Sequence, residues 1–88
     1  MIERKITISN KLGLHARAAA KLVTLASSFQ SKIEIKTKCK SANGKSIMSV
    51  MMLAASKGTE ITLCIEGNDE KEAIAALEVL INRRFDEE

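Results

Sequence analysis

The order of strands and helices expected along this chain predicts an α+β fold, in which helices cover one side of a single sheet. Segments in which apolar and polar residues alternate are typical of half-buried strands, and segments in which apolar residues recur every three or four positions are typical of amphipathic helices. Their order is strand, helix, two strands, helix, strand, helix. The chain has only 88 residues, too few for two hydrophobic cores, so we expect a single domain over residues 1–88.

The first part of the chain predicts a strand and a helix. Ile6 and Ile8 alternate with polar residues and indicate a short strand, which ends in the polar segment 10–13. From Ala16 the period changes, and apolar residues on one face indicate a helix, which two serines end near residue 28. The residues of that apolar face are Ala18, Leu22, Leu25 and Phe29.

The middle of the chain predicts two strands and a short helix. Alternation over residues 33–37 indicates a strand, and we expect another from Cys39 to Ala42, before the turn-forming pair Asn43-Gly44. Ser46 precedes an apolar run and is therefore the expected N-cap of a helix. Lys57-Gly58 is the expected end of that helix, because glycine favours helix termination.

The last part predicts a strand and a helix. Alternation over residues 61–66 indicates the strand, and Gly67-Asn68 indicates a turn. Asp69 and Glu72 have the spacing of a capping box at the start of the helix. Two arginines follow at the end of this helix, where the helix dipole favours positive charge. The apolar residues of its buried face are Ile74, Leu77 and Ile81.

Charge is distributed unevenly along the chain. Residues 1–46 contain ten basic and two acidic residues, whereas residues 47–88 contain four and nine. A basic first half indicates an acidic or phosphorylated partner, because opposite charges accelerate encounter. Nucleic acid is not the expected partner, because Phe29 and Phe85 are the only aromatic residues and cannot form a stacking platform for bases.

The sequence also argues against membrane insertion, a metal site and a disulfide framework. The longest apolar stretch, residues 47–55, is far shorter than the roughly 18 residues that a transmembrane helix needs, and the N-terminus lacks the apolar segment of a signal peptide. Cys39 and Cys64 are too few and too far apart for a disulfide framework or a cysteine-rich metal site. We therefore expect a cytoplasmic protein without a metal or another cofactor.

His15 is the only histidine and the first candidate for chemistry. It lies within Leu12-Gly13-Leu14-His15-Ala16-Arg17, at the expected start of the first helix. The free N–H groups of a first helical turn, together with Arg17, could hold a phosphoryl group attached to the ring. From the residues alone, an exposed histidine without a function is the alternative. A hydrolase is disfavoured, because no acidic residue occurs between Glu3 and Glu34.

The short helix expected after Ser46 is the second candidate. Met48, Met51 and Met52 form an apolar cluster there, and methionine is adaptable at partner surfaces. Packing into the core is the alternative for this cluster. Both interpretations hold together if Met52 points inward and Met48 outward.

The motifs around these two candidates resemble the HPr family, the histidine-containing phosphocarriers of the bacterial phosphoenolpyruvate-dependent phosphotransferase system. The similar segments are Leu12-Gly13-Leu14-His15-Ala16-Arg17, Lys45-Ser46-Ile47-Met48 and Lys57-Gly58. The resemblance covers essentially the whole chain, including its length and its order of elements. It implies an open-faced β-sandwich of order βαββαβα, with a four-stranded antiparallel sheet and three helices on one face.

The resemblance also implies a role for each candidate residue. His15 would accept a phosphoryl group at Nδ1 from phosphorylated enzyme I and pass it to EIIA domains, and Arg17 would steady that group. Ser46 matches the serine that HPr kinase/phosphorylase modifies in many bacteria. The residues that match the docking patch for partners are Ile47, Met48 and Met51. Such a carrier is not an enzyme, and we expect it to be a monomer.

Two alternatives and two departures accompany this interpretation. The chain could serve a nitrogen branch of the system, or it could be a regulatory binding module whose His15 is never phosphorylated. Ala18 stands where the family usually has proline, but alanine is the best helix former, so we expect the helix to form. Asn-Gly occurs at 43–44, whereas the family often has it near 38–39; Lys38-Cys39 stands there instead, which leaves the turn type of the hairpin open.

Overall fold

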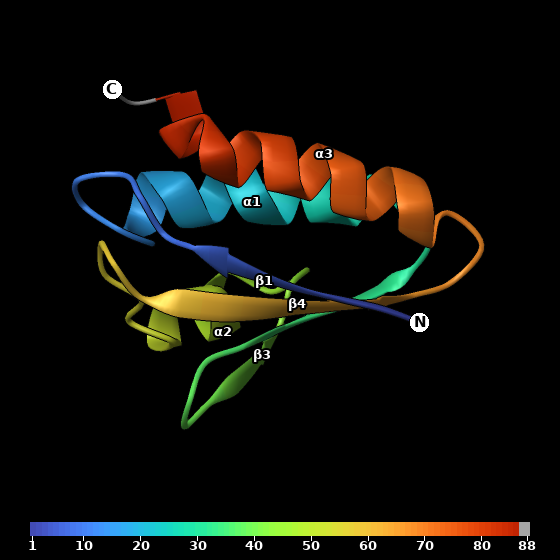
Figure 1. Cartoon of the computed structure of the whole chain (residues 1–88), viewed down its shortest axis with the longest axis horizontal. Coiled ribbons are helices and arrows are strands. Elements are labelled where there is room, and N and C mark those ends of the chain that lie inside the picture. Colours follow the sequence, from blue (N-terminus) through green and yellow to red (C-terminus); the bar gives the residue numbers. More distant parts are fainter. Residues whose placement is uncertain (87–88) are drawn as a thin grey trace.

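The computed structural model describes residues 1–86 as one antiparallel sheet with helices packed on one face (Figure 1). The order βαββαβα and the open-faced arrangement agree with the prediction. The elements are β1 (Ile2–Thr7), α1 (Ala16–Ser27), β2 (Lys32–Lys36), β3 (Ser41–Asn43), α2 (Ile47–Met52), β4 (Glu60–Glu66), α3 (Glu70–Asn82) and a short 3-10 turn (Arg84–Asp86).

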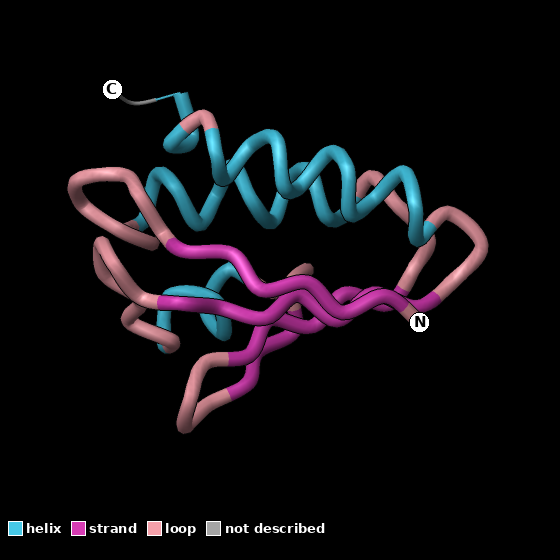
Figure 2. The backbone as a smooth tube through the Cα atoms, in the orientation of Figure 1, coloured by secondary structure: helices cyan, strands magenta, loops and turns pink. Residues whose placement is uncertain are grey.

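The four strands lie in the order β1-β4-β2-β3, and every neighbouring pair is antiparallel (Figure 2). The register places Ile6 of β1 opposite Ile61 of β4, and it places Ile33 of β2 opposite Ile65 of β4. Because alternate side chains of a strand point to opposite faces, this register gathers the branched apolar residues on one face of the sheet.

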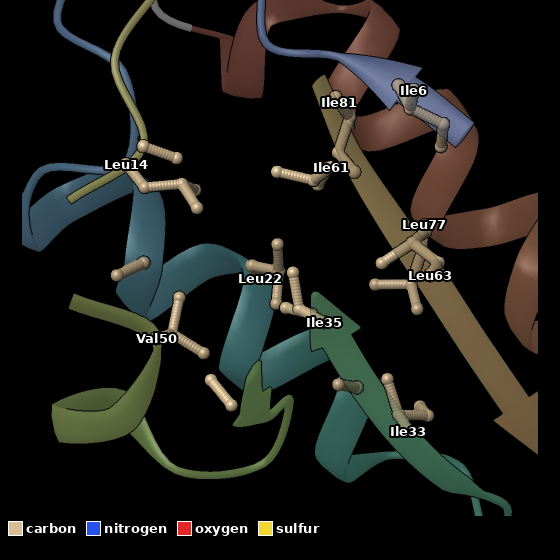
Figure 3. Close-up of a cluster of buried hydrophobic side chains, with 14 of the residues drawn as sticks. Ile6, Leu14, Leu22, Ile33, Ile35, Val50, Ile61, Leu63, Leu77 and Ile81 are labelled. Atoms are coloured by element: carbon tan, nitrogen blue, oxygen red, sulfur yellow. The ribbon is translucent and has the colours of Figure 1, made fainter. Parts of the chain in front are cut away.

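The hydrophobic core lies between that face of the sheet and the helices (Figure 3). Leu22 of α1 and Leu77 of α3 are fully buried against the strands, and Val50 is the buried residue of α2. The opposite face of the sheet carries polar residues such as Lys5 and Lys36, and none of the helices in residues 1–86 covers it. None of these helices is long and apolar enough to cross a membrane.

The predicted position of the third strand was partly wrong. β3 begins at Ser41 rather than Cys39, because residues 37–40 form the turn of the hairpin. The Thr37 amide donates to the Lys40 carbonyl at 2.8 Å, and the Lys40 amide donates to the Thr37 hydroxyl at 3.2 Å. Asn43-Gly44 is therefore not the hairpin turn and instead leads from β3 toward α2.

The predicted end of the second helix was also wrong. α2 ends at Met52, before the expected stop at Lys57-Gly58. Leu53 and Ala55 turn into the core, and Ala54 between them has a positive φ of 53°, which a right-handed helix cannot contain. Gly58 instead lies in the turn before β4.

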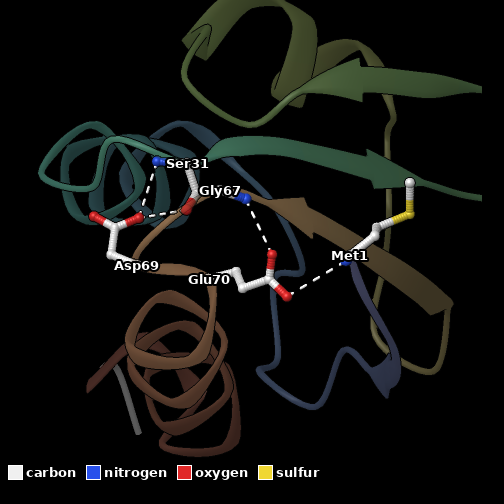
Figure 4. Close-up of polar contacts among 5 residues, drawn as sticks. All are labelled: Met1, Ser31, Gly67, Asp69 and Glu70. Carbon is white, nitrogen blue, oxygen red and sulfur yellow. Dashed lines mark hydrogen bonds and ion pairs between the residues drawn. The ribbon is translucent and has the colours of Figure 1, made fainter.

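The predicted capping box at the start of α3 does not form. Asp69 occupies the N-cap position, but its carboxylate makes no cap hydrogen bond. It accepts hydrogen bonds from the Ser31 amide at 3.0 Å and from the Ser31 hydroxyl (Figure 4). It also accepts a hydrogen bond from the Gln30 amide at 2.8 Å. The bond from the Ser31 hydroxyl and that from the Gln30 amide lower the pKa of Asp69. Glu70 accepts from the Gly67 amide at 3.1 Å, in place of the contact expected from Glu72.

The end of α3 differs slightly from the expected arrangement. The helix stops at Asn82, so that both arginines follow it, and Arg83 pairs with Asp86 at 2.8 Å. Phe85 is fully buried, with a positive φ of 56°. The Lys21 ammonium of α1 donates to the Phe85 carbonyl at 2.7 Å, which attaches this segment to α1.

Candidate functional site

The loop between β1 and α1 is attached to the segment before β4. The Ile8 amide donates to the Thr59 carbonyl at 2.9 Å, and the Leu14 amide donates to the Ala55 carbonyl at 2.8 Å. Leu14 is also buried in the core. These contacts immediately precede His15, so the backbone that carries the histidine is fixed from one side by main-chain hydrogen bonds and from the other by packing.

Gly13 is required for this attachment. Its φ is +67°, in the left-handed region that side chains disfavour. A Cβ at this position would lie 2.4 Å from the Ala55 carbonyl oxygen and 2.7 Å from the Ser56 Cα. The Gly13 carbonyl accepts a hydrogen bond from the Asn10 side-chain amide at 2.7 Å, and Asn10 is fully buried. The glycine before the histidine therefore has a packing reason as well as a conformational one.

His15 is the N-cap residue of α1 and is half-buried. Its backbone is extended, and its carbonyl accepts the Ala19 amide at 2.8 Å, which is the first bond of the helix. The amides of residues 16–18 therefore have no acceptor within the helix. The first turn contains no acidic residue, and the positive end of the helix dipole lies beside the imidazole. This arrangement favours an anion on or near the ring.

Arg17 lies in the first turn of α1 and is exposed. Within residues 1–86, no carboxylate pairs with its guanidinium. A guanidinium without an internal partner can form two parallel charge-assisted hydrogen bonds to a phosphate. Among residues 1–86, Arg17 therefore has no carboxylate partner that would compete with a bound anion.

Ser46 is the N-cap of α2, as predicted. Its hydroxyl oxygen accepts a hydrogen bond from the Ser49 amide at 3.4 Å, and its carbonyl accepts the Val50 amide at 3.0 Å. The side-chain bond is long, so we expect this cap to contribute less than the ordinary value of about 1 kcal/mol. Ser46 is only half-buried, which leaves part of its surface exposed.

The apolar side chains of α2 lie mainly on the surface. Met48 is 67% exposed, and Met52 is 69% exposed, so the expectation that Met52 points inward was wrong. Ile47 and Met51 are about two-fifths exposed. α2 is anchored instead by Val50, which sequence reasoning missed. The signal was present, because Val50 and the buried Leu53 are three residues apart, as two residues on one helical face must be.

The fold brings the two candidate segments together. α2 packs against α1, and Leu14 and Val50 belong to the same buried cluster (Figure 3). α2 and the loop that carries His15 lie in the same half of the molecule (Figure 1). Within residues 1–86, no group of three or more His, Cys, Asp or Glu side chains is arranged to hold a metal ion.

A family model described as "PTS HPr component phosphorylation site" matches residues 2–83. The phosphocarrier protein HPr of Xylella fastidiosa is 53% identical over 88 residues, which cover 100% of this chain and 99% of the relative. A crystal structure of HPr-C-His from Thermoanaerobacter tengcongensis is 50% identical, with a TM-score of 0.96 over 100% of this chain and 99% of that chain. The fold is that of the HPr structures, and the similar proteins are small phosphocarriers. The chain belongs to the HPr family, the phosphocarriers of the phosphotransferase system.

Two further relatives bear on the alternatives. The phosphocarrier protein NPr of Shewanella violacea is 45% identical over 86 residues, which cover 98% of this chain and 94% of the relative. A crystal structure described as an HPr dimer from Thermoanaerobacter tengcongensis is 49% identical, with a TM-score of 0.77 over 97% of this chain and 98% of that chain.

Proposed function

We propose that this chain carries a phosphoryl group on His15 in the cytoplasm. It accepts the group from phosphorylated enzyme I and transfers it to EIIA domains of the sugar phosphotransferase system. The observation that carries the proposal is the position of His15. This residue occupies the N-cap of α1 behind a loop that Gly13 and Leu14 hold in place. The position combines a fixed nucleophile with donors for an anion.

The chemistry is a phosphoryl transfer without a cofactor. The Nδ1 lone pair attacks phosphorus, a P–N bond forms, and the bond between phosphorus and the donor breaks with its electron pair staying on the donor. The free amides of the first turn and the Arg17 guanidinium stabilise the negative charge of the transferred group. The same contacts are available when the group leaves, so that transfer to the next acceptor reverses the steps.

The test is phosphorylation by phosphoenolpyruvate and enzyme I. We expect one phosphate per chain, labile in acid and stable in base, as a P–N bond requires. His15→Ala should abolish the label while the melting temperature stays near that of the parent, because His15 is not part of the core. Label retained by a folded His15→Ala protein would rule out the proposal, and so would a folded parent that accepts no phosphate.

We propose further that phosphorylation of Ser46, by an HPr kinase/phosphorylase where one is present, inhibits this carrier. A phosphate adds about −1.5 to −2 charges at pH 7. At the N-cap these charges meet the amides of the first turn of α2, so the fold tolerates them. They also lie beside the exposed Ile47 and Met48, where an acidic partner docking on this surface would be repelled. The alternative is that Ser46 is a helix cap alone.

The variants Ser46→Asp and Ser46→Asn separate these roles. Both side chains can cap the helix, and only the aspartate carries a charge. We expect both variants to melt no lower than the parent, and only Ser46→Asp to accept phosphate from enzyme I much more slowly. Equal rates for the two variants would leave Ser46 as a cap.

The similarity to an NPr protein supports a second candidate function, which is the same chemistry in a nitrogen branch. The EIIA acceptor distinguishes the two. Purified phosphorylated carrier should transfer to a sugar-branch EIIA faster than to its nitrogen-branch counterpart, and the reverse order would favour the second candidate.

We propose that the carrier acts as a monomer. Sedimentation at micromolar concentration tests this proposal against the dimer described for a relative.

A further inference from the structure

The methionines of α2 form an unusual surface. Met48, Met51 and Met52 are 67%, 40% and 69% exposed, on a helix of only six residues. Most methionine side chains are found in protein interiors. Here three methionine residues are at least two-fifths exposed within one turn and a half of helix. We refer to these three residues as the methionine patch.

An exposed thioether reacts with peroxides. A sulfur lone pair attacks the peroxide oxygen, an S–O bond forms, and the O–O bond breaks. Methionine is oxidised to its sulfoxide, and hydrogen peroxide is reduced to water. The product is a polar group that accepts strong hydrogen bonds. When a partner covers it, the sulfoxide loses its water, and the lost hydration opposes binding.

We propose that the methionine patch is a reversible oxidation site that controls docking of the carrier on enzyme I. The inference rests on the proposed function, because it takes α2 to be part of the surface with which the carrier docks on enzyme I. Hydrogen peroxide converts the patch from apolar to polar and weakens docking, while the phosphoryl chemistry at His15 is unchanged. Methionine sulfoxide reductases return the sulfoxides to thioethers.

The packing of α2 indicates that the fold survives this oxidation. The buried anchor of the helix is Val50, and its N-terminus is capped by Ser46. None of the three methionines belongs to the buried core cluster. Oxidation therefore changes the surface of α2 and leaves its attachment in place. A loss of docking without a loss of structure separates a switch from simple damage.

Met1 supplies an internal control. Met1 is 71% exposed, so peroxide reaches it as readily as the patch. Its amino group pairs with Glu70 at 3.4 Å (Figure 4), at the opposite end of the sheet from α2 (Figure 1). A sulfoxide at Met1 should therefore leave docking unaffected.

The experiment uses the full chain with Cys39→Ser as the background, because Cys39 is exposed and peroxide would also oxidise its thiol. The protein is treated with hydrogen peroxide, the sulfoxides are located by peptide mass spectrometry, and phosphorylation by enzyme I is measured over a range of carrier concentrations. We expect the KM for the carrier to rise about tenfold or more, with kcat nearly constant. Incubation with sulfoxide reductases should restore the original KM.

A triple variant, Met48→Leu with Met51→Leu and Met52→Leu, is the matched control. Leucine has a similar volume and polarity but no sulfur. This variant should keep its KM after peroxide treatment, although Met1 is still oxidised. An unchanged KM in the oxidised parent would overturn the inference, and so would an equal rise in the triple variant. If the untreated parent accepts no phosphate, the proposed function itself fails, which is a distinct result.

Discussion

The two ends of α1 are held in place by different interactions. At the His15 end, the loop before the helix is fixed by neutral contacts, which are main-chain hydrogen bonds and the close packing of Gly13 on Ala55. At the other end, the Asp69 carboxylate accepts hydrogen bonds from Gln30 and Ser31, just after the helix. The first attachment contains no charge, whereas the second depends on a carboxylate that must remain ionised.

This difference suits the proposed carrier, which would bind an anion at the His15 end of α1 only. A carboxylate beside His15 would repel a phosphoryl group, and the first turn of α1 contains none. At the distant end a carboxylate does no harm, and backbone amides stabilise its charge. The Glu70 carboxylate, at the same distant end, is also stabilised by a backbone amide, because the hydrogen bond from the Gly67 amide lowers the pKa of Glu70. Rigidity at the proposed phosphoryl site thus comes from packing and neutral hydrogen bonds.

The largest expected effect comes from Gly13→Ala. Left-handed backbone and a Cβ 2.4 Å from the Ala55 carbonyl oxygen should together cost about 2–4 kcal/mol of unfolding free energy. That loss lowers the melting temperature by roughly 10–25 °C in a domain of this size. Phosphorylation of His15 should slow as well, because the loop shifts. Calorimetry and the enzyme I assay measure the two effects.

Gly58→Ala is the control for this prediction. Gly58 also has a positive φ, of 91°, but a Cβ there meets nothing within 4 Å. Gly58→Ala should therefore lower the free energy of unfolding only by the conformational strain, about 1–2 kcal/mol. Equal losses in the two variants would show that packing on Ala55 adds nothing. Because all contacts of Gly13 are neutral, the cost of Gly13→Ala should be the same at pH 7 and pH 4.

The second prediction concerns Asp69→Asn at the other end of α1. The hydrogen bond from the Ser31 hydroxyl holds the pKa of Asp69 in the folded protein below its ordinary value of 3.8, so the ionised form of Asp69 stabilises the fold above that pH. This contribution decreases as the pH falls through the folded-state pKa. Asp69→Asn should melt several degrees lower than the parent at pH 7, and the difference should shrink as the pH falls below 3.8.

Thermal unfolding of both proteins over this pH range measures the difference. Glu70 is present in both, so its own titration cancels in the comparison. Phosphorylation at His15 should be unchanged in Asp69→Asn. A melting difference that stays constant with pH would mean that the charge of Asp69 contributes nothing and that only the geometry of its hydrogen bonds matters.

Sequence reasoning succeeded where the signal is local. The periodic apolar residues of α1 and α3 identified both helices, because the helical period appears in the sequence itself. The N-cap at Ser46 was also correct, since a cap binds an amide three residues later. The motif around His15 was recognised by resemblance, and the structure adds the reason for its glycine, which is the contact with Ala55.

It failed where a distant partner decides the outcome. Asp69 and Glu72 have capping-box spacing, but the Asp69 carboxylate instead accepts hydrogen bonds from the Gln30 and Ser31 amides, about 38 residues away. α2 stops early because Leu53 and Ala55 enter the core, and Ala55 binds Leu14. These competitions depend on the tertiary fold, so spacing within one segment could not reveal them.

The smallest expected effect on stability, and a large one on transfer, comes from Arg17→Ala. Arg17 is exposed and, within the described residues, holds no carboxylate, so its removal should change the melting temperature by no more than a few degrees. Transfer should slow, because the phosphoryl group loses a charged donor at the end of α1 where packing and neutral hydrogen bonds fix the backbone. Arg17→Lys keeps the charge but not the paired donors of the guanidinium, so its transfer rate should lie between that of the parent and that of Arg17→Ala. If Arg17→Lys and Arg17→Ala transfer the phosphoryl group equally slowly, the effect comes from the geometry of the guanidinium and not from its charge. If both variants transfer at the parental rate, Arg17 is not part of the site.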